Sequence, residues 1–219
     1  GEYTFHYWIW KNYLDKIENN WIGFCQYRKF WIPKKIGAEN LNFNVLQNSV
    51  LNEVPKEYED YESIIGEPFY VNQFRFSKFI KRNLKKMILN PSLFYNKNKR
   101  TLKFHFDMWH GHGNLDKAIN LLDIDDKKDF KEYMETNVSF HPHNMFICKS
   151  KDKLRDYYEV VFPWLERCEG IFGFDDLKGY GLQRIYGFLA ERFMSYWFLK
   201  NTKFKTMPIY FKDISNFKL

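Results

Sequence analysis

The sequence lacks the features that mark several large classes of protein. It has three cysteines in 219 residues, and they are widely separated, which excludes a disulfide framework and is typical of reduced thiols in a cytoplasmic protein. It shows no long apolar run and no signal-peptide pattern, so we expect a chain without a membrane span. Zinc-finger spacing, an RNP-like block and a helix-turn-helix pattern are also missing, so nucleic acid is the least favoured partner.

Aromatic residues and positive charge are abundant instead. Phe, Tyr and Trp make up 21% of the residues. Two interpretations are open: the codon usage of a low-GC genome, and a surface that binds sugars, because flat aromatic faces cover the apolar faces of pyranose rings. The formal net charge of +7 indicates an anionic partner, such as a phosphate-bearing donor or an anionic membrane.

The apolar pattern predicts alternating helices and strands, which favours an α/β fold in a single domain. We expect helices at residues 3–17, 74–88, 115–122, 129–136, 154–168 and 182–199. We expect strands at residues 21–26, 61–65, 144–148 and 208–211. The helix at 154–168 contains Pro163, which predicts a kink or an interruption just before it.

Tyr27 and Arg28 follow the first expected strand. A strand that ends in polar and cationic groups delivers them to the carboxyl edge of a sheet, where open α/β sheets bind ligands. A guanidinium binds phosphate in a bidentate manner, so Arg28 is the first candidate to neutralise an anion, supported by Lys29 or Lys11. The alternative for Arg28 is a structural ion pair.

Four blocks of sequence occur in order along the chain. They are E-x-T-x-x-Y-W-x-W-K-N from Glu2 to Asn12, I-G-x-x-x-Y-R-K-F from Ile22 to Phe30, H-P-H-N-M-F-I from His141 to Ile147, and Q-R-I-Y-G-F-L-A-E-R from Gln183 to Arg192. Together they resemble a bacterial family long catalogued as a domain of unknown function. That family occurs in capsule and lipopolysaccharide gene clusters and is regarded as a glycosyltransferase family with a GT-A-like fold.

The resemblance implies a GT-A-like open mixed sheet flanked by helices. Residues 1–219 would form one glycosyltransferase-like domain, with a poorly matching insertion at about 41–101 that includes a basic helix. His143 stands where the family has Tyr, and Gln26 stands where His is common. The family also carries a strand before its first block, and the sequence begins inside that block, so we expect either a shortened chain or a subfamily with a different start.

The implied activity is transfer of a sugar from a nucleotide-diphosphate sugar to a capsular or lipopolysaccharide acceptor, either a glycan or a lipid-linked glycan. The alternative is a non-catalytic carbohydrate- or nucleotide-binding domain of a larger polysaccharide-assembly protein. The residues expected at the donor are Tyr27, Arg28, Lys29 and Lys11. The residues expected at the acceptor or the sugar are Trp8, His141, Asn144 and Arg184, although His141 and Asn144 also suit a simple turn around Pro142.

Glu191 is the candidate for the base that takes the proton of the acceptor hydroxyl. The expected helix places Arg184, Gly187 and Glu191 on one face, since seven residues are nearly two full turns. The alternative for Glu191 is an ion pair with Arg184 or Arg192 that braces the fold. His110 is the second catalytic candidate, as a hydrogen-bonding group on a loop over the donor or acceptor.

Metal ligands are only weakly indicated. Asp123 and Asp125 form the only Asp-x-Asp string, at a position where Asp commonly caps a helix. Side chains of zinc-ligand type occur at His105, Asp107, His110 and His112. Their spacing is not a known tetrahedral set, and Gly111 and Gly113 predict a flexible loop. We expect that protein cations neutralise the diphosphate and that no cofactor is required, with Mn or Mg as the alternative.

Residues 74–88 have the pattern of a basic amphipathic helix. From Arg75 to Arg100 there are nine basic residues and no acidic one. This segment is either an ordinary solvated surface or a site that docks to anionic lipid head groups, where each Lys or Arg contributes about 1 kcal/mol. Docking would suit an enzyme with a lipid-linked acceptor, resting on the inner face of the cytoplasmic membrane.

Overall fold

The computed structural model describes residues 2–35, 37, 42–73, 91–175 and 177–213. The chain forms two compact units, and each is assembled from separate segments. The unit that we call the helical unit contains residues 68–140 and 159–196. The unit that we call the sheet unit contains residues 2–67, 141–158 and 197–219. The two units are described separately below.

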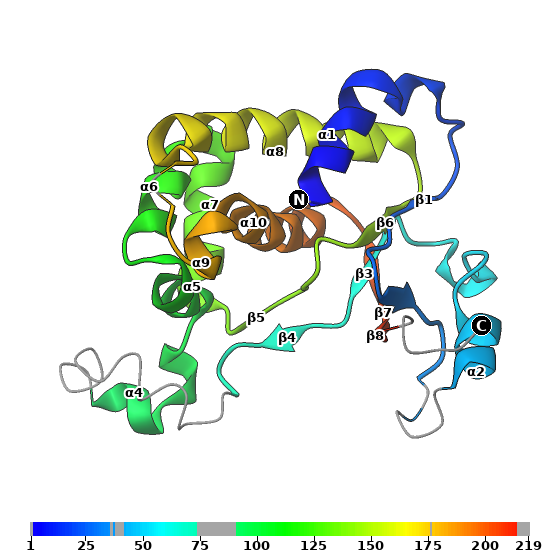
Figure 1. Ribbon diagram of the computed structural model, residues 1–219, viewed down its shortest axis with the longest axis horizontal. Coiled ribbons are helices and arrows are strands. Elements are labelled where there is room, and N and C mark those ends of the chain that lie inside the picture. Colours follow the sequence, from blue (N-terminus) through cyan, green and yellow to red (C-terminus); the bar gives the residue numbers. More distant parts are fainter. Residues whose placement is uncertain (1, 36, 38–41, 74–90, 176, 214–219) are drawn as a thin grey trace. The chain divides into compact units, whose positions relative to one another are not determined.

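The sheet unit is built on a four-stranded mixed sheet with the order β1-β6-β3-β7 (Figure 1). The strands are β1 (Ile22–Gly23), β3 (Ser63–Gly66), β6 (Phe146–Cys148) and β7 (Phe204–Met207). β6 is antiparallel to β1 and to β3, whereas β3 is parallel to β7. The carboxyl ends of β1, β3 and β7 therefore share one edge of the sheet with the start of β6.

Smaller elements complete the sheet unit. They are the antiparallel pair β2 (Lys29–Trp31) and β8 (Ile209–Phe211), the helices α1 (Glu2–Asn12) and α2 (Phe43–Ser49), and the 3-10 helices at Leu14–Lys16 and Lys56–Tyr58. All four residues of β3 are buried, as expected for an inner strand covered on both faces. The main apolar cluster of this unit consists of Trp31, Tyr58, Ile64, Met145, Ile147 and Met207.

The helical unit contains mostly short helices. They are α4 (Ser92–Tyr95), α5 (Leu102–His110), α6 (Asn114–Asn120), α7 (Ile124–Thr136) and α9 (Tyr180–Gln183), with a 3-10 turn at Lys97–Lys99 and the strand pair β4 (Phe69–Tyr70) and β5 (Ser139–Phe140). Two longer helices, α8 (Lys151–Phe172) and α10 (Ile185–Asn201), each have residues in both units. Aromatic rings fill its core: Phe130 lies 5.3 Å from Phe193 and 6.0 Å from Trp164, between ring centroids.

The predicted fold class is confirmed, since the chain is a mixed α/β protein with a mixed sheet flanked by helices. The strands expected at 61–65, 144–148 and 208–211 correspond to β3, β6 and β8. The expected basic helix at 74–88 lies outside the described residues. β3 falls within the segment 41–101 that was expected to be an insertion. No helix in the described part of the chain is long and apolar enough to cross a membrane.

Three local features differ from what was expected. The loop expected around His105 and His110 is the helix α5, which Thr101 caps through a 3.3 Å hydrogen bond from the Phe104 amide. Of the two alternatives at Pro163, the interruption is wrong, because the residues on both sides of the proline are buried and the packing of α8 outweighs one lost hydrogen bond; the kink stays a prediction. The strand β7 was missed, since its residues Phe204–Met207 lack a clear alternating pattern.

Candidate functional site

Two loops meet at the carboxyl edge of the four-stranded sheet. Gln26, which follows β1, donates a hydrogen bond from Nε2 to the backbone oxygen of His143, which precedes β6. Nδ1 of His141 donates to the backbone oxygen of Gly66, at the end of β3, over 2.6 Å. His141 and Asn144 are both buried. The 141–144 loop is therefore held by the ends of β1 and β3, the two strands that flank β6.

These contacts fix the chemical state of His141. Burial lowers the pKa of His141, and the bond to the Gly66 carbonyl offsets this only in part. The ring is therefore neutral near pH 7. Because Nδ1 carries the proton that it donates to Gly66, Nε2 is the unprotonated nitrogen of the ring.

Backbone strain is concentrated in the same two loops. Arg28, His143 and Asn144 have φ angles of 66°, 86° and 51°, and they are the non-glycine residues with positive φ in the described part of the chain. Such conformations cost about 1–3 kcal/mol each and cluster at functional sites. The strain therefore marks this edge of the sheet as a candidate functional site.

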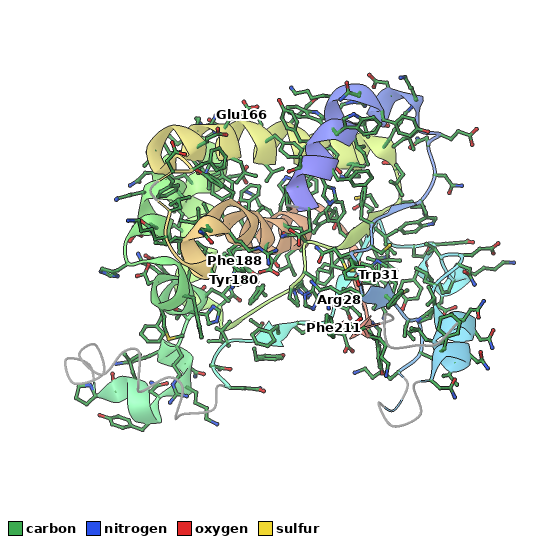
Figure 2. The ribbon with its side chains drawn as sticks, viewed as in Figure 1. Arg28, Trp31, Glu166, Tyr180, Phe188 and Phe211 are labelled. Carbon is green, nitrogen blue, oxygen red and sulfur yellow. The ribbon has the colours of Figure 1, made fainter. Side chains whose placement is uncertain are left out.

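Arg28 is partly held in place by an ion pair. Its Nη1 lies 2.8 Å from Oδ2 of Asp213, and its Cζ lies 4.7 Å from the centroid of the Tyr27 ring and 5.4 Å from that of Phe211. Arg28 and Phe211 are labelled in Figure 2. The side chain of Arg28 is still 37% exposed. Nζ of Lys29 donates to Oε1 of Gln26 over 2.7 Å. The structural ion pair considered from the sequence is therefore formed, and it leaves part of the guanidinium accessible.

The two candidates on α1 make contacts within the first thirteen residues. Nζ of Lys11 lies 3.5 Å above the Trp10 ring, and the Trp8 ring stacks with Tyr13 at 6.0 Å. Trp8 is 51% exposed. Their expected roles, Lys11 at the donor and Trp8 at the sugar, stay predictions.

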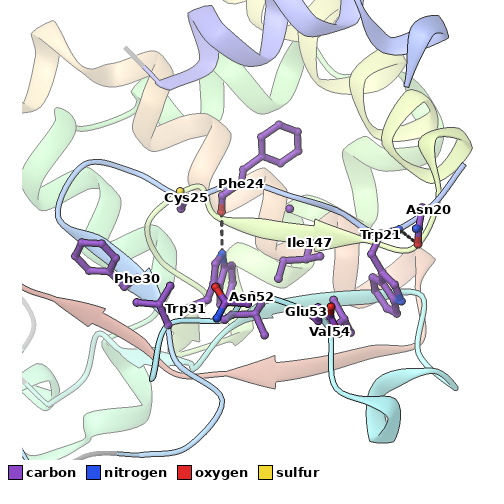
Figure 3. A pocket seen from close by; sticks show the side chains of 13 residues that line it. Asn20, Trp21, Phe24, Cys25, Phe30, Trp31, Asn52, Glu53, Val54 and Ile147 are labelled. Atoms are coloured by element: carbon purple, nitrogen blue, oxygen red, sulfur yellow. Dashed lines mark hydrogen bonds between the residues drawn. The ribbon is translucent and has the colours of Figure 1, made fainter. Parts of the chain in front are cut away.

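A cavity of about 610 Å³ lies beside β1 in the sheet unit (Figure 3). Trp21, Trp31 and Phe30 supply aromatic walls. Nε1 of Trp31 donates to the backbone oxygen of Phe24 over 2.8 Å, which fixes the plane of the indole. The polar residues of the lining include Asn20, Asn52 and Glu53. Cys25 and Phe30, which also line the cavity, lie on either side of the turn that carries Arg28.

The helical unit has its own pocket, of about 580 Å³, which we call the arginine pocket. At its base the Arg192 side chain is only 2% exposed. Nη1 of Arg192 lies 2.6 Å from Oε2 of Glu191, and Nη2 lies 3.4 Å from Nδ1 of His105. The Arg192 Cζ lies 3.4 Å above the ring of Phe140. Of the two ion pairs considered for Glu191, the one with Arg192 is therefore formed.

The histidines of the arginine pocket are neutral near pH 7. Burial, and then the charge of Arg192, lower the pKa of His110 to about 4 and that of His105 well below its usual value. Nδ1 of His110 donates to the Gly181 carbonyl over 3.1 Å, so its Nε2 carries a lone pair. The His110 ring also stacks on Phe188 at 4.1 Å.

We expected Arg184 and Glu191 on one face of a single helix, and this was wrong. α9 ends at Gln183 and α10 begins at Ile185, so Arg184 lies between the two helices. Its Nη1 donates to the Tyr180 hydroxyl over 2.7 Å. The expectation failed because Gly179 is followed by a short separate helix, Tyr180–Gln183, that the apolar pattern does not distinguish from α10.

The residues considered as metal ligands have other partners. Nδ1 of His112 lies 2.8 Å from Asp107, whereas His105 and His110 face Arg192 and Gly181. Asp123 occupies the N-cap position of α7, but its side chain makes no capping hydrogen bond and pairs instead with Arg167 at 3.2 Å. Within the described ranges no group of three His, Cys, Asp or Glu side chains is arranged to hold a metal. These residues therefore do not fit a metal site.

Sequence reasoning missed several residues of the arginine pocket. Trp109, Phe140 and Lys178 also line it, and they lie far from Glu191 in the sequence. Arg192 was considered only as a bracing partner. Its position in an otherwise apolar helix was the available signal, because a buried arginine needs partners.

Comparison with known proteins assigns the sequence to a family. A family profile described as a domain of unknown function, DUF4422, matches residues 1–202. No curated protein sequence matches the chain. A solved structure described as the apo form of the bifunctional glycosyltransferase WbbM is similar with a TM-score of 0.56 and 19% sequence identity. The match covers 96% of this chain and 36% of that one, and at this identity it establishes similarity of fold.

Proposed function

This chain belongs to the DUF4422 family and shares the fold of a solved glycosyltransferase, and on this premise we propose that it is a glycosyltransferase of GT-A type that uses a nucleotide-diphosphate sugar. The observation that carries the proposal is the pair of strained, hydrogen-bonded loops at the carboxyl edge of the sheet. They present Arg28, the neutral His141 and Asn144 where open α/β sheets bind ligands.

The donor is proposed to bind in the sheet unit. Its nucleoside would occupy the cavity beside β1, between aromatic walls and amide groups. Its diphosphate would displace Asp213 from Arg28, which can then bind phosphate oxygens in a bidentate manner. Lys29 and Lys11 add positive charge, and Tyr27 is 69% exposed beside Arg28. Protein cations would thus neutralise the leaving group, and no metal step is invoked.

Chemistry requires an oxygen nucleophile and a proton acceptor. The bond from the acceptor oxygen to the anomeric carbon forms as the bond from that carbon to the diphosphate breaks, and the electron pair leaves with the diphosphate. We assign Glu191 as the acceptor of the hydroxyl proton, with the Nε2 lone pair of His110 as a second hydrogen-bonding group. His141, Asn144, Arg184 and Trp8 are assigned to the sugars.

The wider context of the reaction follows from the resemblance described above. We propose capsule or lipopolysaccharide assembly in the cytoplasm as the setting, with a glycan or lipid-linked glycan as acceptor. The basic segment at residues 74–88 would then attach the enzyme to anionic lipids at the inner face of the membrane. Binding to anionic vesicles that persists unchanged in high salt, or that equals binding to neutral vesicles, would contradict this attachment.

A panel of sugar nucleotides tests the proposal. Hydrolysis of one donor in the absence of acceptor, with release of UDP or GDP, supports a glycosyltransferase. A crystal soaked with UDP or GDP should show the diphosphate beside Arg28. Tight binding of a sugar nucleotide with no turnover on any glycan acceptor would favour the alternative, a non-catalytic binding domain of a larger assembly protein.

A further inference from the structure

The arginine pocket carries more positive charge than a neutral sugar requires. Arg192 and Lys178 both line it, and Glu191 is the one carboxylate among its lining residues in the described chain. The two lining histidines, His105 and His110, are neutral for the reasons given above. The pocket is therefore cationic in balance, and an anionic ligand is favoured over a neutral one.

Arg192 also has an unused hydrogen-bond donor. Its Nη1 and Nη2 have Glu191 and His105 as partners, whereas Nε is buried without a partner in the described structure. Because Nε is itself inaccessible, Arg192 acts on a ligand in the pocket through its charge, which is strong in these buried surroundings.

Flat aromatic surfaces stand at the opening of the arginine pocket. Tyr180 is 68% exposed and Trp109 is 37% exposed, and both line the pocket with Phe188. The ring centroids of Tyr180 and Phe188 lie 6.1 Å apart, and both side chains are labelled in Figure 2. Such exposed faces are suited to the apolar face of a pyranose ring.

The rim of the pocket is fixed in place by a close backbone contact. A Cβ atom at Gly181 would lie 2.1 Å from the backbone oxygen of Trp109, so only glycine allows this approach. The Gly181 carbonyl accepts the hydrogen bond from His110. The segment that carries Tyr180 is thereby fastened to the end of α5, and the pocket is formed before a ligand binds.

We propose that the arginine pocket binds an acceptor sugar that carries a carboxylate, a pyranose of the uronic acid class. The ring lies against Trp109 and Tyr180, and the carboxylate accepts a hydrogen bond from Lys178 and is attracted by the charge of Arg192. Glu191 is compensated by its ion pair with Arg192. This inference rests on the proposed glycosyl transfer, because it names the class of acceptor.

Binding of methyl glycosides to the full chain, measured by ligand-observed NMR, tests the inference. Methyl glucuronoside or methyl galacturonoside should bind about tenfold or more tightly than methyl glucoside, since a hydrogen bond to a charged group contributes about 1.5–3 kcal/mol. Equal binding of acidic and neutral glycosides, or no binding of either, would overturn it.

Two variants with the same change of charge separate the pocket from general electrostatics. Lys178→Glu should weaken binding of the uronoside about tenfold, whereas Lys117→Glu, at an exposed lysine of the same unit outside the pocket, should not. Equal losses in both variants would overturn the inference. Donor hydrolysis without acceptor is measured on the same preparations: its retention in the absence of uronoside binding rejects this inference but not the proposed function.

Discussion

Nη1 of Arg28 and Oδ2 of Asp213 lie 2.8 Å apart, so the guanidinium that is proposed to receive the donor diphosphate is held in the free protein by a carboxylate. An anion that binds at Arg28 must displace Asp213. Both side chains are about one-third exposed, and ion pairs of this kind contribute only about 0–1 kcal/mol, so the exchange is not costly.

Arg28→Ala is therefore expected to reduce donor turnover about tenfold or more while the melting temperature changes little, because a charged hydrogen bond to phosphate contributes about 1.5–3 kcal/mol. Arg28→Lys should restore little, since an ammonium group cannot bind two phosphate oxygens in a planar fork. Arg155→Ala is the matched control, because Arg155 forms comparable ion pairs with Asp15 and Asp152. Full activity in Arg28→Ala would remove Arg28 from the donor site.

Glu191→Gln separates a catalytic role from a structural one. As a base, Glu191 should be needed for turnover, and its replacement should lower turnover about 100-fold or more, within the range for general-base removal. Donor binding should change little, whereas the melting temperature should fall, because the amide can accept a hydrogen bond from Arg192 but does not balance its buried charge. A lower melting temperature with normal turnover of the folded enzyme would show that Glu191 only braces Arg192.

Chelation tests the role of protein cations. If Arg28 and the neighbouring lysines neutralise the diphosphate, turnover should survive EDTA and should not rise when Mn or Mg is added. The measurement is donor hydrolysis in chelated and metal-supplemented buffer. A strict requirement for either ion would contradict this expectation and make Asp123 and Asp125 candidate metal ligands again.

Gly181 and Gly170 provide a pair of glycine-to-alanine substitutions with opposite expected signs. Gly181→Ala should destabilise the protein and weaken binding in the arginine pocket, because the new Cβ collides with the backbone of Trp109. Gly170→Ala, in α8, meets nothing within 4 Å and should stabilise by up to about 1 kcal/mol. Urea unfolding measures both. A neutral Gly181→Ala would show that the rim segment is free to move away from α5.

Stability should fall in mild acid because of buried histidines. Burial lowers the pKa of His6 from 6.5 to about 3 in the folded chain, so below pH 6.5 the unfolded chain binds a proton that the folded chain does not. The stability present above pH 6.5 is therefore lost as the pH falls towards 3, at up to about 1.4 kcal/mol per pH unit for this residue. Urea unfolding between pH 8 and pH 5 should show the slope, and His6→Phe should reduce it. A flat profile would contradict a neutral buried His6.

Much of the sheet edge was predictable from the sequence because its strands are short apolar runs that end in distinctive polar residues. Arg28 was identified in this way, His141 and Asn144 were assigned through the family resemblance, and the structure places all three in the loops at the same edge. The contact that ties these loops together, from Gln26 to His143, joins residues 117 positions apart. No local pattern encodes such pairings.

The arginine pocket was harder to foresee. The two glycines after His110 suggested a loop, although Leu102 and Phe106 have the four-residue spacing of a buried helix face. The partners of Arg192 come from three different elements, α5, β5 and α10. A single sequence shows that Arg192 is charged within an apolar helix, but only the fold shows which groups surround it.

The positive φ angles of His143 and Asn144 have a consequence for how this chain can change over time. A glycine at either position would relax the backbone, so a screen that rewards heat resistance alone should enrich glycine there. Retention of larger side chains at both positions under selection for activity would mean that the imidazole and the amide are kept for what they contact. The residues that survive at these two positions would then show that selection for heat resistance and selection for activity favour different side chains.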